Sequence, residues 1–201
     1  MFIYILTTGN KDRMEKTSTF FKKKNIEVHF FNKYSHGDKK TLEEWIFLLE
    51  SKGWKWKFSK GYLENTNFHK RCISNYLNMI AILEDAIIEK RSNYLVLEDD
   101  VLIEDMDAIL KLEIPEECDI LSLYQIKPKI GIVGITKSIS FWGVQGVIYK
   151  NPKKTLDIIK SIEKVNNYDC LISKLRKRLN IYVIYPYLVK PYKTISTVWC
   201  D

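Results

Sequence analysis

The sequence lacks the cysteine pairs and the long apolar runs that mark several classes of protein. Its four cysteines, Cys72, Cys118, Cys170 and Cys200, lie far apart and form no CxxC pair. Neither a zinc site nor a disulfide framework is therefore expected, and free thiols in a reducing compartment are the default. No run of about 18 apolar residues occurs, which excludes a membrane-spanning helix. The apolar run at 2–6 is too short for a signal peptide. We expect a cytoplasmic protein, and peripheral contact with a membrane remains open.

The chain also lacks repeats, low-complexity tracts and Pro- or Gly-rich linkers. A chain of 201 residues without such divisions is expected to form one domain. Gly143 and Gly146 do not belong to a GxGxxG or P-loop pattern, so the signatures of Rossmann dehydrogenases and of kinases are missing. The ending Val198-Trp199-Cys200-Asp201 is not an ER-retention signal.

What is present is ordinary globular composition with an excess of positive charge. Hydrophobic residues make up 46%, enough for a substantial core. The 32 Lys and Arg against 25 acids give a formal charge of +7. This excess suits anionic partners such as nucleotides, nucleic acid or an acidic membrane surface, although compositional drift explains it equally well.

Apolar patterning predicts alternating strands and helices. Residues 2–6 and 26–31 are expected to be strands around a basic helix at 13–25, an opening typical of an α/β sheet with parallel pairing. The other expected strands are 94–97, 119–124, 140–149 and 181–185. The other expected helices are 42–51, 67–90 with Asn67 as its cap, 152–165 and 168–179, and the aromatic stretch 53–62 is expected to be irregular.

Three carboxylates, Glu98, Asp99 and Asp100, directly follow the apolar strand at 94–97. They should lie at the carboxyl end of that strand, where open α/β sheets bind ligands. Adjacent carboxylates repel one another unless a positive charge lies between them, and Mg²⁺ or Mn²⁺ shared with a phosphorylated ligand would supply it. The alternative is that the three acids cap a following helix. We interpret the second acidic group, Glu104, Asp105 and Asp107, as a solvated helix start.

The segment 94–101 resembles the acidic motif of glycosyltransferase family 25, the group that includes lipooligosaccharide and collagen galactosyltransferases. Further segments resemble the family in the same order along the chain: 2–13, Ser74-Asn75 (where the family often has Ser-His), 119–124, 141–149, 168–171, 186–189 and Ser196. The similarity covers nearly the whole chain, but only the acidic motif is specific.

The resemblance implies a GT-A-like α/β fold, in which a Rossmann-type mixed sheet is flanked by helices in a single domain. Its nucleotide-binding part would span about 1–105 and its acceptor-side part about 106–201. The implied donor is a nucleotide-diphosphate sugar, most simply a UDP-sugar, and the implied cofactor is Mn²⁺ or Mg²⁺. Asp100, with Glu98, would bind the metal, and Glu98 or Asp99 would contact the ribose or metal-bound water. Thr7, Lys11 and Arg13, which follow the first strand, would contact the nucleotide.

Inverting transfer to a hydroxyl of a glycan or glycoprotein acceptor needs a base, and Asp169 is the candidate. A helix cap is the alternative role for Asp169. Trp142 and the aromatics of 53–62 are candidates to stack on sugar rings. Such enzymes often take a metal ligand from a C-terminal histidine, but His29, His36 and His69 all lie in the first half. Water is a substitute for that ligand.

Two other functions fit parts of the sequence. The basic helices and aromatics suit a module that binds nucleic acid or an acidic glycan, although no nucleic-acid motif is present and no nucleic-acid partner is expected. A degenerate transferase that binds donor without turnover is the other, because the C-terminal histidine is missing. The sequence does not identify the donor sugar or the acceptor.

Overall fold

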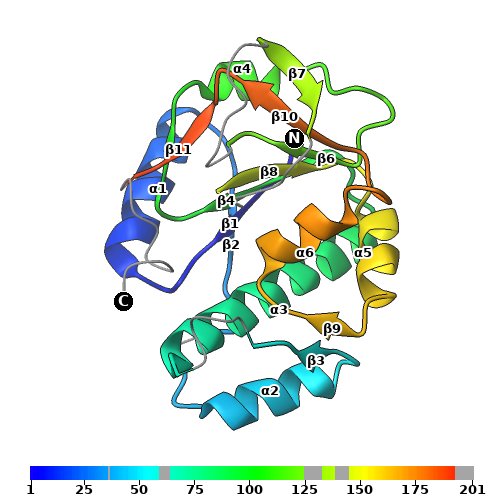
Figure 1. Cartoon of the computed structure of the whole chain (residues 1–201). Helices are drawn as coiled ribbons and strands as arrows, with labels where there is room; N and C mark the ends of the chain where they lie inside the picture. Colours follow the sequence, from blue (N-terminus) through cyan, green and yellow to red (C-terminus); the bar gives the residue numbers. More distant parts are fainter. Residues whose placement is uncertain (36, 59–63, 125–132, 139–144, 193–201) are drawn as a thin grey trace.

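A computed structural model describes residues 1–35, 37–58, 64–124, 133–138 and 145–192 of the chain (Figure 1). They form a mixed α/β domain with one large sheet and two short two-stranded sheets. The helices are α1 (Lys11–Lys23), α2 (Leu42–Glu50), α3 (Thr66–Ile88), α4 (Met106–Leu110), α5 (Pro152–Lys160) and α6 (Tyr168–Leu175). The strands are β1 (Ile3–Leu6), β2 (His29–Phe31), β3 (Lys55–Trp56), β4 (Tyr94–Glu98), β5 (Val101–Ile103), β6 (Ile120–Ser122), β7 (Gly134–Lys137), β8 (Gly146–Tyr149), β9 (Lys164–Val165), β10 (Ile181–Tyr185) and β11 (Val189–Pro191).

The large sheet has the strand order β2-β1-β4-β8-β6-β10-β7. Strand β1 pairs in parallel with β2 and β4, and β6 pairs in parallel with β10. Strand β8 runs antiparallel to both β4 and β6, so these two strands share one direction. The carboxyl ends of β1, β2, β4, β6 and β10 therefore meet at one edge of the sheet.

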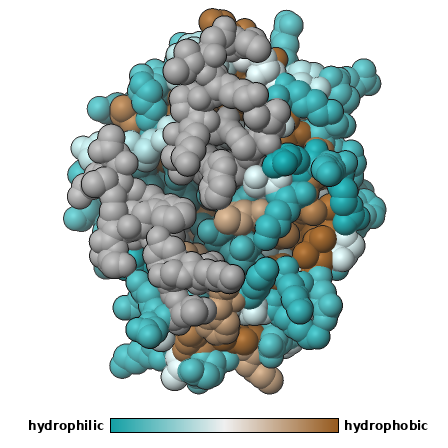
Figure 2. All heavy atoms as spheres, viewed as in Figure 1, coloured by the Kyte–Doolittle hydropathy of each residue, from teal (hydrophilic) through white to brown (hydrophobic). Residues whose placement is uncertain are grey.

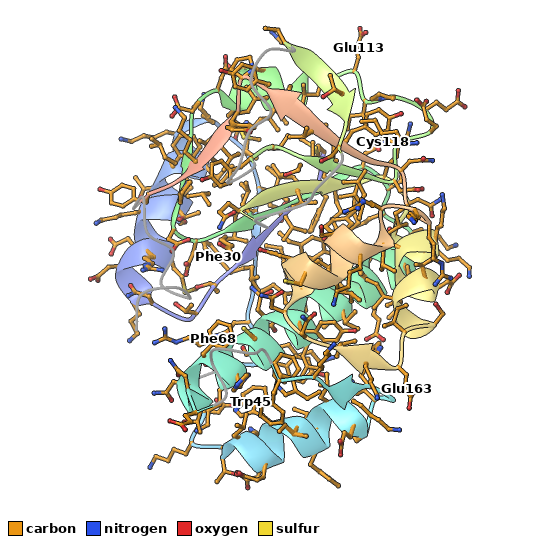
Figure 3. All side chains as sticks on the ribbon, in the orientation of Figure 1. Phe30, Trp45, Phe68, Glu113, Cys118 and Glu163 are labelled. Atoms are coloured by element: carbon orange, nitrogen blue, oxygen red, sulfur yellow. The ribbon has the colours of Figure 1, made fainter. Side chains whose placement is uncertain are left out.

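Both faces of the sheet are covered, because residues along a strand alternate between them. Tyr4 and Val96 pack with helices α2, α3, α5 and α6 on one face, and Ile5 and Leu97 pack with α1 and α4 on the other. Helices of the first set, such as α2 with Trp45 and α3 with Phe68, lie together below the sheet in Figure 3. Hydrophilic side chains cover most of the described surface in Figure 2.

The winding of the chain reverses at β1. The connection from β1 to β2 carries α1 on one face, whereas the connection from β2 to β4 carries α2 and α3 on the other. Ligands of open α/β sheets bind at such a reversal, beyond the carboxyl ends of the strands. Here that position lies between the ends of β1 and β4.

The predicted mixed α/β class is confirmed, and several element boundaries were wrong. Helix α3 begins at Thr66, and its cap is Asn65, whose Oδ1 accepts a hydrogen bond from Phe68 N at 2.8 Å. The predicted cap, Asn67, lies inside the helix. The predicted helix 152–165 ends at Lys160, because Lys164 and Val165 pair with β3 inside the stretch expected to be irregular.

Within the predicted strand 140–149, Gly146 begins β8, and positions 139–144, with Trp142 and Gly143, lie outside the described residues. A Cβ at Gly146 would lie 3.0 Å from Val189 Cγ2 and 3.3 Å from Leu97 Cδ2. The glycine therefore gives room to apolar side chains. His36, 59–62 of the aromatic stretch, Ser196 and Cys200 also lie outside the described residues. In the described ranges, no helix is both long and apolar enough to cross a membrane.

Candidate functional site

Asp99 is the buried anchor of the tip of β4. It is 7% exposed, and its Oδ2 accepts hydrogen bonds from Thr7 Oγ1 at 2.5 Å and from Thr8 N at 3.2 Å. The backbone joins the same strands, because Asp99 N donates to Leu6 O at 3.0 Å. Asp99 therefore fixes the loop after β1 against the end of β4, at the point where the winding reverses.

Arg13 supplies the positive charge for two of the three acids. Its Nη1 lies 3.4 Å from Asp99 Oδ1 and 3.2 Å from Asp100 Oδ2. The N-cap Asn10 sets the first turn of α1, since its Oδ1 accepts a hydrogen bond from Arg13 N at 3.1 Å. Burial raises the pKa of Asp100, and the Arg13 charge opposes that rise. The Asp100 side chain keeps 29% of its surface exposed, which leaves room for a further partner.

Glu98 ends β4 directly before these two acids, and all three line one pocket at the tip. Strand alternation places it on the face of Tyr94 and Val96, the face covered by α3 and α6. Its pKa is raised well above the usual range, first by burial and then by the charges of Asp100 and Asp169. Arg13 lowers this pKa only as the smallest of these influences. Glu98 is thus a carboxyl group whose negative charge the described residues leave largely uncompensated.

Asp169 reaches this side of the tip from the first turn of α6. The cap of that helix is Asn167, whose Oδ1 accepts a hydrogen bond from Cys170 N at 2.9 Å, so the alternative role of Asp169 as the cap is wrong. The neighbouring Tyr168 is buried, and its hydroxyl lies 2.9 Å from that of Tyr149 on β8. This tyrosine pair holds the start of α6 against the sheet, with the charge of Asp169 near Glu98.

A pocket of about 500 Å³ opens beside the tip on the α1 side. Its floor includes Ile5, Phe21 and Leu97, and α1 and β5 face each other across it. Several of its polar or aromatic residues were not predicted from the sequence, among them Lys16, Phe20 and Tyr192. The period of α1 could have indicated Lys16 and Phe20, one and two turns after Arg13. Tyr192 had no local signal, because the pairing of β11 with β5 brings it there.

Of the two acidic groups, only the second lies at the start of a helix. A strand, β5, follows Asp100, so the alternative that Glu98, Asp99 and Asp100 cap a helix is wrong. In the second group Asp105 caps α4, and its Oδ1 accepts a hydrogen bond from Ala108 N at 2.9 Å. Asp107 follows with 71% of its side chain exposed, as expected of a solvated helix start.

The remaining predicted residues lie away from the tip. Lys11 is exposed at the first position of α1 and is not part of the pocket lining. His29 pairs in register with Tyr4, well before the carboxyl end of the sheet. His69 is fully buried in α3, where its Nδ1 accepts a hydrogen bond from Trp56 Nε1 at 3.3 Å. The structure therefore brings Thr7, Arg13, Glu98, Asp99, Asp100 and Asp169 to one site, and it leaves Lys11 outside.

Gln145 is a further polar residue at the tip that sequence reasoning missed. Its backbone oxygen accepts a hydrogen bond from Glu98 N at 3.3 Å, and its side chain is 8% exposed. Its buried Oε1 has no hydrogen-bond partner among the described residues. Buried acceptors are rarely left unpaired, so this oxygen suits a bound water or a ligand group.

The described acids fit a metal site that phosphates and water complete, rather than one made of protein side chains alone. Among the described ranges, no three His, Cys, Asp or Glu side chains converge closely enough to hold a metal ion by themselves. Mg²⁺ and Mn²⁺ in nucleotide sites usually take one or two carboxylates, and phosphates and water complete the shell. Asp100 and Glu98 match that donor set in number and in hard oxygen chemistry.

Comparison with known proteins adds no assignment. No protein-family model matches the chain, and no curated protein matches it. The resemblance to glycosyltransferase family 25 therefore stays a prediction.

Proposed function

We propose that the protein is a metal-dependent glycosyltransferase of the GT-A type, related to family 25. It would transfer a sugar from a nucleotide-diphosphate donor, most simply a UDP-sugar, to a hydroxyl of a glycan or glycoprotein. The observation that carries the proposal is that three adjacent carboxylates differ in their charged partners. They lie between β1 and β4, where the winding of the chain reverses. Arg13 pairs with Asp99 and Asp100, whereas burial and the charges of Asp100 and Asp169 raise the pKa of Glu98 well above its usual range.

The residues on the α1 side fit the binding of the donor. Thr7 and the backbone of Thr8 fix Asp99, and Asp99 in turn holds Arg13 at the edge of the pocket. A guanidinium in this position matches a diphosphate in charge and in hydrogen-bonding geometry. A divalent ion held by Asp100 and Glu98 would stabilise the diphosphate as a leaving group.

The residues on the α6 side fit the activation of the acceptor. Asp169, held in place by Asn167 and by the Tyr149–Tyr168 pair, is the carboxylate that takes the proton from the attacking hydroxyl. The hydroxyl oxygen forms the new bond to the anomeric carbon, the bond to the diphosphate breaks, and the diphosphate leaves with the electron pair. Glu98 lies close enough to Asp169 for the two charges to interact.

Release of UDP from a panel of UDP-sugars tests the proposal, with Mn²⁺ or EDTA and with a mixture of glycan acceptors. We expect Mn²⁺-dependent release that Asp100→Asn lowers by at least about a hundredfold, because a metal-held leaving group depends on its ligand. Asp107→Asn is the matched control, since this neighbouring carboxylate is 71% exposed and lies outside the site. Binding of UDP-sugar without release would instead support the degenerate transferase. Salt-sensitive binding of nucleic acid without donor binding would support the basic binding module.

A further inference from the structure

Three tyrosines form a cluster that the donor and base assignments do not use. The ring centroid of Tyr187 lies 5.4 Å from that of Tyr124 and 5.6 Å from that of Tyr185, and both pairs are edge-to-face. Tyr185 is 37% exposed, and Tyr124 and Tyr187 are half-buried. The cluster is therefore ordered by its own ring contacts, and it still offers aromatic surface to a ligand.

This cluster lies at the same edge of the sheet as the acids. Tyr185 ends β10, and Tyr124 follows β6 by two residues. Both strands run parallel to β4, so their carboxyl ends meet the edge where Glu98 ends its strand. The backbone ties the two tyrosine segments together, because Leu188 N donates to Leu123 O at 3.2 Å.

Strand alternation places the tyrosines on the same face as Glu98. Ile120 of β6 and Ile181 of β10 belong to the core cluster that also contains Val96, which shares its face with Glu98. Tyr124 lies four residues after Ile120, and Tyr185 lies four residues after Ile181, so both continue on that face. This is also the face from which α6 brings Asp169 to the tip.

Two estimates give the separation between the cluster and the acids. Strand β6 is the second neighbour of β4 in the sheet, which corresponds to about 10 Å at the usual strand spacing. Along the other route, Pro191 of β11 pairs with Val101, directly after Asp100, and Tyr187 lies four residues earlier. An extended segment of that length spans about 13 Å. Both values correspond to a short oligosaccharide that reaches from the cluster to the acids.

We propose that Tyr124, Tyr185 and Tyr187 form a subsite for a neutral sugar residue of the acceptor, distal to the hydroxyl that reacts. Aromatic faces stack on the apolar face of a pyranose ring, and tyrosine hydroxyls hydrogen-bond to its hydroxyl groups. Because tyrosine is uncharged near neutral pH, the cluster suits a neutral sugar better than an ionic group. The subsite rests on the proposed function for its role in transfer, but glycan binding can be measured without the donor.

The first test is binding of the full chain to a printed array of defined oligosaccharides without nucleotide. We expect binding to at least one oligosaccharide, which Tyr185→Ala and Tyr187→Ala each weaken by about tenfold, since a stacked ring is lost. Tyr185→Phe and Tyr187→Phe should stay within about threefold, because the ring remains. The matched control is Phe47→Ala, which removes a 73% exposed ring from α2 and should change nothing. Thermal melts check that each variant is folded.

Failure of the subsite and failure of the proposed function give different results. If the wild type binds no oligosaccharide, or if folded Ala variants bind as well as the wild type, the subsite is wrong. In transfer assays the Ala variants should raise the acceptor KM by about tenfold and leave the donor KM within about twofold. Donor turnover with an unchanged acceptor KM overturns the subsite alone. Absence of donor turnover overturns the proposed function, while tyrosine-dependent glycan binding would still support the subsite.

Discussion

The neighbouring carboxylates at the tip of β4 have different charged partners on the two sides of the sheet. On the α1 side, Asp99 and Asp100 share Arg13, and Asp99 accepts further hydrogen bonds from Thr7 and Thr8. On the α6 side, Glu98 lies near Asp169, and the charges around it raise its pKa. Among the described residues, the α1 side therefore has a cationic partner for its two acids, whereas Glu98 lies near a further carboxylate.

Because of this difference, substitutions on the α1 side should affect stability and substitutions on the α6 side should affect activity. Removing a partner from a completed buried pair leaves polar groups without compensation and costs stability. Removing a carboxylate from the α6 side relieves repulsion between carboxylates. It should lower activity rather than stability. Variants on the two sides should thus fall into two classes, one that loses stability and one that loses activity.

The largest effect is expected for Asp169→Asn, in the first turn of α6. Loss of the base should lower kcat for transfer by about a thousandfold, equivalent to about 4 kcal/mol. The donor KM and the melting temperature should change little. Asp157→Asn, on the exposed side of α5, is the control carboxylate. A kcat within about threefold of wild type would remove Asp169 from the mechanism.

Asp99→Ala should have the next largest effect, and that effect should be on folding. The substitution leaves Thr7, Thr8 N and Arg13 without their shared partner, so we expect a loss of about 3 kcal/mol in the free energy of unfolding. Urea denaturation measures it, with Asp107→Ala as the control. A stability equal to that of the control would show that the contacts of Asp99 with Thr7, Thr8 and Arg13 do not stabilise the fold.

Glu98→Gln should stabilise the protein at alkaline pH. The folded-state pKa of Glu98 lies well above the usual range of a glutamate, so the folded state retains a proton that the unfolded state releases. Stability conferred by that proton is present at low pH and is lost as pH rises towards the folded pKa. Glutamine does not ionise, so the Tm of the variant should exceed that of the wild type by about 2–4 °C at pH 8 and match it near pH 4. A gap that widens towards low pH would contradict this assignment.

The smallest effect concerns the Thr7 hydroxyl. Thr7→Val removes the donor to Asp99 and the acceptor for Gly9 N, at a cost of about 1 kcal/mol. Thr7→Ser keeps the hydroxyl and should cost less. Urea melts of the two variants measure the difference, and equal stabilities would mean that the hydroxyl is not needed.

The sequence predicted the parts of the site that depend on local patterns. An apolar strand followed directly by acids placed Glu98, Asp99 and Asp100 at the carboxyl end of β4. Contact of Thr7 and Arg13 with the nucleotide was implied by the family resemblance. Alternation in a mixed sheet then separated Glu98 from Asp99, and this follows from the strand register rather than from composition.

One feature that the sequence analysis missed is local: Asn65, whose Oδ1 accepts a hydrogen bond from Phe68 N, caps α3 in place of the predicted Asn67. The other missed features depend on contacts between distant segments. Tyr192 and Gln145 reach the tip through pairing with β5 and β4, many residues away in the chain. The spacing of apolar residues near Tyr192 and Gln145 does not predict these strand pairings.

Isothermal titration of UDP into the wild type and into Asp100→Asn, each with Mn²⁺ or EDTA, tests the proposed metal site. The proposal is that a cation shared with a diphosphate binds between Glu98 and the partly exposed carboxylate of Asp100. We predict that Mn²⁺ tightens UDP binding to the wild type by at least about tenfold and leaves binding to Asp100→Asn unchanged. Equal UDP affinity of the wild type in Mn²⁺ and in EDTA would contradict the account.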